Sequence, residues 1–277
     1  MPEPPTTSAL LEVEDLAVHF KIRGRRGEVR KAVDGVSLRV ERGTTLGLVG
    51  ESGSGKSTLA MAALRLIEPT SGRVRFDGID VTAASRRDLR ALRRRTAVVF
   101  QDPYASLDPR FTIGASIAEP LAVHGLRKGK ERTDRVAELL ERVGLDPNGA
   151  NRRPYELSGG QRQRVGIARA LAAEPDLIVF DEPVAALDVS VQAQVLNLLT
   201  GLTTDLGLTS LFISHDLAVV EHVSDRIAVM SAGQIVEEGT AAEITANPQH
   251  PYTRTLLDAV PPATPAAARA RRAQRRG

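Results

Sequence analysis

The sequence of 277 residues contains no cysteine. This absence excludes disulfides, thiolate zinc sites and cysteine-ligated iron–sulfur clusters. No apolar run is long enough to cross a bilayer, because charged residues interrupt the longest candidates within a few positions. The first residues, MPEPPTTSALLEVED, lack the basic region and following apolar stretch of a secretory signal. We therefore expect a cytoplasmic protein.

A basic surface is also missing from most of the chain. The formal net charge is +3, and five arginines lie in the last ten residues, ARARRAQRRG. Removing these five positive charges turns +3 into −2 for the rest, so the body of the protein lacks the charge typical of nucleic-acid binding. Residues 262–277 are predicted to be a disordered, solvated tail, and contact with an anionic membrane surface is the alternative.

Hydrophobic patterning predicts an α/β fold. Near the start, Leu16, Val18 and Phe20 fall on one face at a spacing of two and residues 36–40 repeat the pattern, which indicates half-exposed antiparallel strands. Segments of helical pattern alternate with short buried strands, predicted at 45–49, 96–100, 177–180 and 210–213. This alternation is typical of a mostly parallel sheet that is covered on both faces. Residues 102–165 read as helix and loop, which predicts an inserted α-helical subdomain.

A glycine-rich segment joins the strand at 45–49 to a helix predicted over 57–67. Its sequence, GESGSGKS, fits the phosphate-binding pattern G-x-x-x-x-G-K-[ST]. Glycines let successive N–H groups turn toward phosphate oxygens, Lys56 adds a positive charge, and the Ser57 hydroxyl can bind Mg²⁺. A flexible turn with an incidental lysine is the alternative, which the flanking strand and helix disfavour. The residues expected to contact nucleotide here are Gly50, Glu51, Ser52, Gly53, Ser54, Gly55, Lys56, Ser57 and Thr58.

Two carboxylates end the buried strand LIVFDE. Ligands of open α/β sheets bind beyond the carboxyl ends of the strands, where Asp181 and Glu182 fall. Asp181 can hold Mg²⁺ through water, and Glu182 can polarise an attacking water as general base. Two solvated acids at a strand end are the alternative, which the phosphate loop makes less attractive.

The segment LSGGQ precedes another predicted helix. Ser158 is a good N-cap for this helix, and capping explains part of the pattern. A helix N-terminus with a serine hydroxyl and free glycine N–H groups is also an anion site. We therefore expect Ser158, Gly159, Gly160 and Gln161 to bind phosphate as well.

Together with Ser214-His215-Asp216 after a later strand, these motifs resemble the ATPase domain of ABC transporters. The resemblance covers nearly the whole chain, and LSGGQ is the most selective of its motifs among proteins with this phosphate loop. It implies a P-loop NTPase fold with a RecA-like core, an antiparallel β subdomain and the inserted α-helical subdomain. The ATPase domain would span residues 8–261, with the helical subdomain at about 102–165.

The resemblance also implies roles for two further residues. Gln101 matches the glutamine that contacts Mg²⁺ and the attacking water and senses the membrane subunits, and His215 matches the histidine that contacts the γ-phosphate and positions Glu182. The implied cofactors are ATP and Mg²⁺. The implied catalytic residues are Glu182, His215, Gln101 and Lys56, and the implied Mg²⁺ ligands are Ser57, Gln101 and Asp181.

The sequence departs from the family pattern at two places. The loop at Leu187-Asp188 is preceded by Ala186 where the family usually has serine, which removes a hydroxyl near the expected seam between two ATPase chains. The family also usually has an aromatic residue ahead of the phosphate loop that stacks on adenine. Here only Phe20 is available, and it can equally be a core residue.

The C-terminal motif NPQHPYTR, within residues 245–261, resembles that of oligopeptide and dipeptide uptake ATPases. The segments FQDPYASLDPR and VGESGSGKSTLA are similar to the second of the two ATPases that such systems encode. The resemblance implies an ATPase subunit of an ABC importer of oligopeptides or dipeptides. Import of nickel or another small solute is the alternative, followed by a soluble ABC ATPase without a transport role. By their chemistry, the motif residues indicate a proline-bounded turn with a structural aromatic anchor.

The chain carries one copy of each motif, whereas in the family the phosphate loop of one ATPase meets the LSGGQ of another. Residues 158–161 are therefore expected to act on the ATP of a second ABC ATPase chain. We expect this partner to be a paralogue, with an identical chain as the alternative. Two transmembrane permease subunits and, indirectly, an extracytoplasmic solute-binding protein complete the implied assembly, on the cytoplasmic side of the cell membrane and without nucleic acid.

Overall fold

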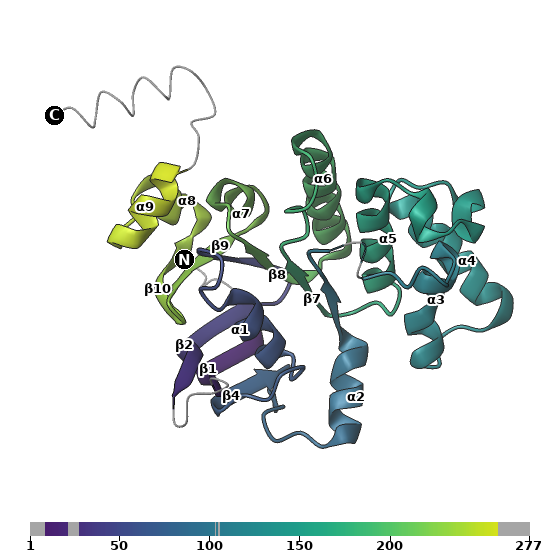
Figure 1. The fold of residues 1–277 in the computed structure, drawn as a ribbon. Helices are drawn as coiled ribbons and strands as arrows, with labels where there is room; N and C mark the ends of the chain where they lie inside the picture. Colours follow the sequence, from purple (N-terminus) through teal and green to yellow (C-terminus); the bar gives the residue numbers. More distant parts are fainter. Residues whose placement is uncertain (1–8, 22–27, 103, 105, 260–277) are drawn as a thin grey trace, which may run out of the picture.

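The structure is a computed structural model that describes residues 9–21, 28–102, 104 and 106–259. The basic tail predicted at 262–277 lies outside the described residues. Two sheets and a set of helices make up the described part, which Figure 1 shows with the helical insertion at one end and the antiparallel strands at the other. Among the described helices none is long and apolar enough to cross a membrane.

The first sheet is antiparallel, in the order β2-β1-β4-β5. Its strands are β1 (Ala9–Lys21), β2 (Val29–Glu41), β4 (Ser71–Phe76) and β5 (Ile79–Asp80). Asp77 and Gly78 connect β4 to β5 with φ values of 54° and 74°, as expected of a tight Asp-Gly hairpin turn. The half-exposed antiparallel strands predicted near the start of the chain are therefore confirmed.

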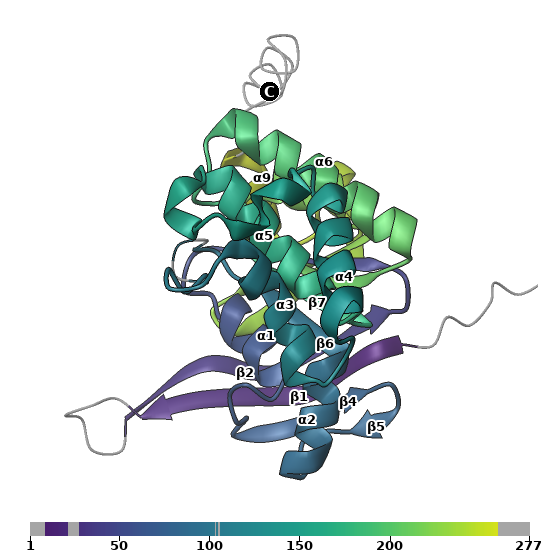
Figure 2. The same ribbon diagram turned by 90° about the vertical axis from the view of Figure 1, so that its right-hand side faces the viewer.

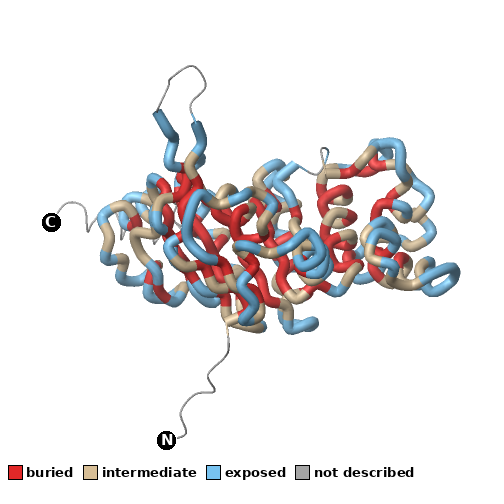
Figure 3. Tube along the Cα trace, turned by 90° about the horizontal axis from the view of Figure 1, so that it is seen from below, coloured by how far each residue is buried: buried red, intermediate tan, exposed pale blue. Residues whose placement is uncertain are grey.

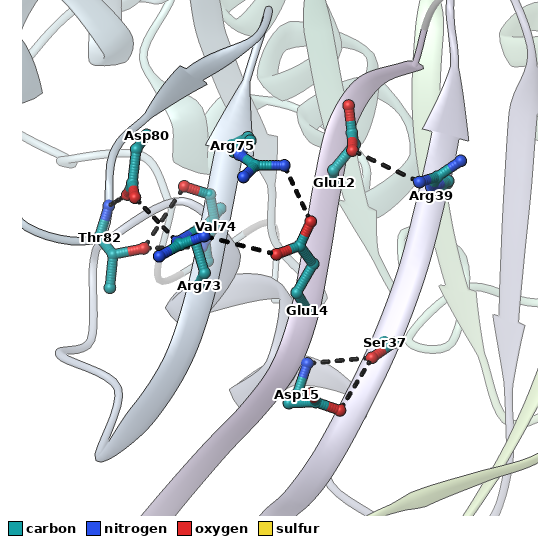
Figure 4. A network of polar contacts seen from close by, with 10 residues as sticks. All are labelled: Glu12, Glu14, Asp15, Ser37, Arg39, Arg73, Val74, Arg75, Asp80 and Thr82. Carbon is teal, nitrogen blue, oxygen red and sulfur yellow. Dashed lines mark hydrogen bonds and ion pairs between the residues drawn. The ribbon is translucent and has the colours of Figure 1, made fainter.

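Charged side chains cover the outer face of this sheet (Figure 4). Glu12 lies opposite Arg39 on β2, and an oxygen of Glu12 is 3.7 Å from an Arg39 nitrogen. Glu14 accepts a 2.9 Å hydrogen bond from Arg75 on β4 and lies 4.0 Å from Arg73. Cross-strand pairs of opposite charge contribute modestly to stability and favour the observed register.

The second sheet has the strand order β10-β9-β3-β8-β7-β6. Its strands are β3 (Thr45–Val49), β6 (Thr96–Val99), β7 (Leu177–Asp181), β8 (Thr209–Ser214), β9 (Arg226–Ser231) and β10 (Gln234–Thr240). All neighbours pair in parallel except β9 and β10, which form an antiparallel pair. The prediction of an α/β fold with a mostly parallel sheet is confirmed.

Alternating residues of the central strands enter two different apolar cores. In β7, Leu177 and Val179 join the core shared with the antiparallel sheet, whereas Ile178 and Phe180 join the core shared with the insertion. In β8, Phe212 likewise joins the core shared with the insertion, whereas Leu211 and Ile213 on either side of it join the core shared with the antiparallel sheet. The six-stranded sheet is therefore covered on both faces, one face by β1, β2 and β4 with two helices, the other by helices. Figure 3 shows buried stretches gathered in the middle of the molecule and also inside its helical end.

The helices connect the strands and form the insertion. They are α1 (Lys56–Ala63), α2 (Arg86–Arg95), α3 (Ile113–Val123), α4 (Gly129–Arg142), α5 (Gly159–Leu171), α6 (Val189–Leu206), α7 (Leu217–Val223), α8 (Ala241–Ala246) and α9 (Pro251–Ala259), with two 3₁₀ turns, η1 (Pro147–Asn151) and η2 (Pro154–Glu156). Figure 2 shows α3, α4 and α5 together in front of the central strands. Residue 165, the predicted end of the insertion, falls inside α5.

Two predicted boundaries were wrong by a few residues. The helix predicted over 57–67 ends at Ala63, and Arg65 adopts a left-handed φ of 53° as the chain turns toward β4. The strand predicted over 96–100 ends at Val99, and Phe100 is 45% exposed. In both cases an apolar residue just beyond the element extended its hydrophobic pattern without being part of it.

Candidate functional site

The phosphate-loop sequence lies between β3 and α1, as predicted. Gly55 has a φ of 109°, and a Cβ at this position would come within 2.1 Å of the carbonyl oxygen of Ala32 on β2. Only glycine fits this backbone and this close approach. The loop is thus wrapped against the antiparallel sheet before it enters α1.

A pocket of about 240 Å³ opens at this loop. Its lining comes from β1, β2, the loop with α1, and the ends of β6 and β7. The lining residues are Phe20, Arg30, Ala32, Ser52, Gly53, Gly55, Lys56, Ser57, Thr58, Gln101 and Glu182. The fold therefore brings Phe20, Gln101 and Glu182 to the loop from three distant parts of the sequence.

Lys56 is buried at the start of α1 and is held by the loop itself. Its amine donates hydrogen bonds to the carbonyl oxygens of Gly50, at 2.6 Å, and Glu51, at 2.9 Å. An ammonium has three donors, so one remains for a ligand. Burial lowers the pKa of Lys56, while the negative charges of Glu182, Asp181 and Glu51 oppose this change.

Ser57 and Asp181 meet across the top of the sheet. The Ser57 hydroxyl donates a 2.8 Å hydrogen bond to Asp181, which is buried at the end of β7. Burial raises the pKa of Asp181, and the neighbouring charge of Glu182 adds to this, whereas the hydrogen bond from Ser57 and the charge of Lys56 lower it. A cation bound beside this buried carboxylate stabilises its ionised form.

These oxygen atoms fit Mg²⁺ in particular. Mg²⁺ prefers oxygen ligands and is usually held by one or two protein groups, several waters and substrate phosphates. Among the residues that the structure describes, no group of three or more His, Cys, Asp or Glu side chains forms a cage for a metal ion. Ser57 and Asp181 are therefore suited to a cation that arrives with a phosphate ligand.

Glu182 lies beside His215 at the same edge of the sheet. The Nδ1 atom of His215 is 3.1 Å from a carboxylate oxygen of Glu182. The Glu182 side chain is 15% exposed and that of His215 is 54% exposed, so the acid is more sheltered from solvent than the imidazole. The two groups share a hydrogen bond that can orient the carboxylate.

The backbone of Glu182 is strained, which the sequence did not reveal. Its φ of 50° lies in the left-handed region, although its N–H still donates a 2.9 Å hydrogen bond to the carbonyl oxygen of Ile213 on β8. A non-glycine residue held in a sparsely populated backbone region costs about 1–3 kcal/mol, and such residues concentrate at functional sites. The structure therefore keeps an unfavourable backbone conformation at Glu182, which directs its carboxylate into the pocket.

Residues 158–161 lie elsewhere. Ser158 caps α5, and a capping box links it to Gln161. A Cβ on Gly160 would come within 2.4 Å of Val191, so glycine is needed where α5 packs against α6. None of the four residues lines the phosphate-loop pocket, and Figure 1 shows α5 well separated from α1, with β7 and β8 between them. Within one chain, the structure does not bring this segment to the phosphate loop.

The loop before α6 has a structural task of its own. Asp188 accepts a hydrogen bond from the Val191 N–H at 3.1 Å and another from the Ser190 hydroxyl at 2.8 Å, and thereby caps α6. Ala186, which stands where the family usually has serine, is exposed. Because Ala186 is exposed, the absence of a serine hydroxyl here leaves no gap in the packing of the described residues.

The structure adds two residues to the predicted set. Arg30 lines the pocket because it is the cross-strand partner of Phe20 in the β1–β2 pair. Tyr252, within the C-terminal motif, accepts a 2.9 Å hydrogen bond from the Glu51 N–H of the phosphate loop. The register of a hairpin with a long connection is not written in the sequence, so no local signal identified Arg30. The motif had indicated that Tyr252 is a structural aromatic anchor. Nothing in the sequence indicated that its hydroxyl contacts the phosphate loop.

Family models match two parts of the chain. Residues 33–185 match the family described as ABC transporter, and residues 236–277 match the C-terminal region of oligopeptide and dipeptide transporters. The first match covers more than half of the sequence and includes the phosphate loop, the segment before α5, and the end of β7.

Similar proteins carry names that agree with these families. A putative peptide import ATP-binding protein of Brucella ovis is 54% identical over 260 residues, which cover 94% of this chain and 81% of that protein. The glutathione import ATP-binding protein GsiA of Shigella flexneri is 55% identical over 267 residues, which cover 95% of this chain but 43% of GsiA.

Two solved structures have a similar fold. The dimeric post-hydrolysis state of the ATP-binding cassette MJ0796, bound to ADP and Pi, has a TM-score of 0.75 and is 32% identical, covering 83% of this chain and 98% of that one. The cbiO1 subunit of the ABC transporter complex cbiONQ from Clostridium perfringens has a TM-score of 0.76 and is 30% identical, covering 86% and 91%.

Proposed function

Since this chain belongs to the ABC transporter family of ATP-binding proteins, we propose that it hydrolyses ATP to energise an importer of oligopeptides or dipeptides. The observation that carries the ATPase assignment is the convergence of Lys56, Ser57, Asp181 and Glu182 at one edge of the parallel sheet. We take residues 8–261 as the ATPase domain, with the helical subdomain inserted at about 102–165 and the C-terminal motif at 245–261.

The phosphate loop binds the triphosphate. Lys56 has one donor left after its bonds to Gly50 and Glu51, and this donor faces the β- and γ-phosphates. The backbone N–H groups of residues 55–58 add further donors at the positive end of α1. Phe20 and Arg30, side by side on the antiparallel sheet, provide a flat apolar surface and a cation for adenine.

Hydrolysis depends on the carboxylate and histidine beside the loop. Glu182 accepts a proton from the water that attacks the γ-phosphate, and His215 holds the carboxylate in place while its ring faces the phosphate. Gln101 lines the same pocket, and its side-chain amide contacts the attacking water. When bound, Mg²⁺ neutralises charge on the phosphate oxygens, and Ser57 and Asp181 are the residues that would hold it.

The separation of Ser158–Gln161 from the pocket supports a paired arrangement. These residues cap α5 with N–H groups and a hydroxyl suited to an anion, yet their own chain offers them no nucleotide. In the proposed pair, they close over the ATP of the second ATPase chain. The dimeric state of the related cassette MJ0796 supports this arrangement, and we propose a paralogous partner, with a homodimer as the alternative.

The transported solute is proposed from the relatives. The C-terminal region matches that of oligopeptide and dipeptide transporters, and the two relatives described above are named for peptide import and glutathione import. We therefore propose that the chain sits on the cytoplasmic face of the membrane with two permease subunits and is served by an extracytoplasmic solute-binding protein. Nickel or another small solute is the second candidate.

The test is reconstitution of the chain with its ATPase partner and permeases in proteoliposomes. Phosphate release should require Mg²⁺ and should rise when a peptide-loaded binding protein is added outside. Lys56→Ala, which removes the charge at the phosphates, should abolish the release. Absence of hydrolysis in the wild-type assembly would overturn the ATPase assignment, whereas hydrolysis that responds to nickel-loaded but not peptide-loaded binding protein would overturn the solute.

A further inference from the structure

The C-terminal motif reaches the phosphate loop through one side chain. The Tyr252 hydroxyl accepts a hydrogen bond from the N–H of Glu51, 201 residues earlier in the sequence, at 2.9 Å. The ring of Tyr252 packs against the apolar core that includes the insertion and one face of the parallel sheet. The motif thus contacts the loop by a directed polar contact that rests on a fixed aromatic ring.

The target of this contact is the peptide group that holds the lysine. The carbonyl oxygen of Gly50 and the N–H of Glu51 belong to one peptide group, which is planar and rigid. That carbonyl accepts the 2.6 Å hydrogen bond from Lys56, while the N–H donates to Tyr252. The orientation that suits one bond therefore fixes the direction of the other.

The segment that carries Tyr252 is itself firmly held. Glu237 on β10 accepts hydrogen bonds from the backbone N–H groups of Gln249, at 2.6 Å, and His250, at 3.0 Å, and so holds the turn that leads into α9. Burial alone would raise the pKa of Glu237, but hydrogen bonds to its carboxylate, including these two, outweigh burial and lower it. Thr253, next to Tyr252, is completely buried.

A second contact joins the same region to the loop. The turn between β9 and β10 donates the Gly233 N–H to the carbonyl oxygen of Ser54 at 2.9 Å. β10 then leads directly to α8 and α9. The loop is therefore fastened near its middle by the turn before β10 and near its start by the motif after it.

We infer that Tyr252 is a positioning residue for the nucleotide site: its hydroxyl orients the Gly50–Glu51 peptide, and through it the ammonium group of Lys56, toward the phosphates. This inference rests on the proposed ATP binding at the loop. It gives the C-terminal motif of this chain a defined task beside the phosphates. A free N–H at Glu51 would otherwise allow the peptide to rotate and take the lysine with it.

The experiment compares ATP affinity in purified wild type and Tyr252→Phe, which removes the hydroxyl and keeps the ring. We expect ATP to bind about 3- to 10-fold more weakly to the variant, the range for losing one hydrogen bond. Tyr155→Phe makes the same chemical change at a tyrosine that is 70% exposed, and it should leave affinity unaltered. The melting temperature of nucleotide-free Tyr252→Phe should fall only slightly, since ring packing is retained and a single exposed hydrogen bond is lost.

A double-mutant cycle separates positioning from general loosening of the fold. If Tyr252 acts through Lys56, Tyr252→Phe should cause no further loss of affinity in a Lys56→Ala background titrated to higher ATP concentration. Equal affinity of wild type and Tyr252→Phe would overturn the inference, and so would a full additional loss in the Lys56→Ala background. A wild-type protein that binds no ATP would instead overturn the proposed function, and the inference with it.

Discussion

The phosphate-loop sequence and the segment before α5 both lie at helix N-termini and are both proposed to bind phosphate, but they are built differently. Around the loop, side chains from β1, β2 and the ends of β6 and β7 converge, and its lysine and serine are bonded to groups within the chain. Around Ser158, the bonds stay within the first turn of α5, because the serine and Gln161 cap each other. This difference agrees with the proposal that the loop binds nucleotide within its own chain, whereas the α5 segment completes the site of a second chain.

The largest effect expected from this comparison concerns turnover at the loop side. Glu182→Gln should lower phosphate release by about 10²- to 10⁴-fold, the contribution of a general base, while ATP still binds. The paired, ATP-bound state should then accumulate, which size-exclusion chromatography with ATP can measure. Glu221→Gln on the exposed side of α7 serves as control. Unchanged turnover in Glu182→Gln would refute the general-base role.

The next effect separates the two sites most directly. Ser158→Asp keeps a good N-cap for α5 but places a carboxylate where the partner's triphosphate would lie, so turnover of the pair should fall about 10- to 100-fold. ATP affinity of the isolated chain and its melting temperature should stay as in wild type. Isothermal titration and thermal unfolding measure both. Reduced affinity in the isolated chain would show that the two sites are not separate.

A smaller effect is expected in stability, at Asp181. The folded state raises the pKa of this carboxyl above its ordinary value of 3.8, so the folded chain binds this proton more tightly than the unfolded chain does. At neutral pH, the ionised carboxylate therefore reduces stability, and Asp181→Asn should raise the free energy of unfolding of the nucleotide-free protein by about 1 kcal/mol while Mg²⁺-dependent hydrolysis is lost.

The pH dependence checks the cause of that gain. As the pH falls through the raised pKa toward 3.8, the wild-type carboxyl becomes protonated in the folded protein and its cost disappears. The advantage of Asp181→Asn, measured by urea unfolding at several pH values, should shrink accordingly. An advantage that grows as the pH falls would contradict the assignment. Asp205→Asn, at an exposed position of α6, provides the control.

The smallest effect is expected at the edge of the pocket. Phe20 is 43% exposed beside the loop, which argues against a core role, and Phe20→Ala should weaken ATP binding about 2- to 5-fold by removing a stacking surface. Phe20→Tyr should retain affinity. Inorganic triphosphate, which lacks a base, should bind equally to wild type and both variants. If triphosphate binding falls as well, Phe20 supports the loop and does not stack on adenine.

Much of the fold and of the loop could be predicted from the sequence, because the physical signals are local. The apolar runs that became β3, β7 and β8 are buried along their whole length, and Ser85 and Ser158 each begin a helix through a capping box. The carboxyl ends of parallel strands share one edge, so Asp181 could be expected near Ser57. Fold class was predicted correctly for these reasons, and the family was predicted correctly from the resemblance of the motifs to those of ABC ATPases.

The rest depends on contacts that a sequence pattern does not encode. Arg30 enters the pocket through the β1–β2 register, which contains several irregularities. The left-handed backbone of Glu182 follows from how β7 meets β8, because its N–H bonds to Ile213. The bond from Glu51 to Tyr252 joins opposite ends of the chain. Each of these features is set by tertiary packing, which no short segment contains.

The core on the helical side of the parallel sheet is continuous with the interior of the insertion. Ile117 and Leu139 of the insertion belong to the same buried cluster as Phe180 and Phe212 of the sheet. Closely packed interiors do not deform smoothly, because side chains exchange one interlocked arrangement for another. A tilt of the insertion against the sheet would therefore be a switch between discrete packings. Adding or removing a single methyl group where the insertion meets the sheet would change the rate of that switch.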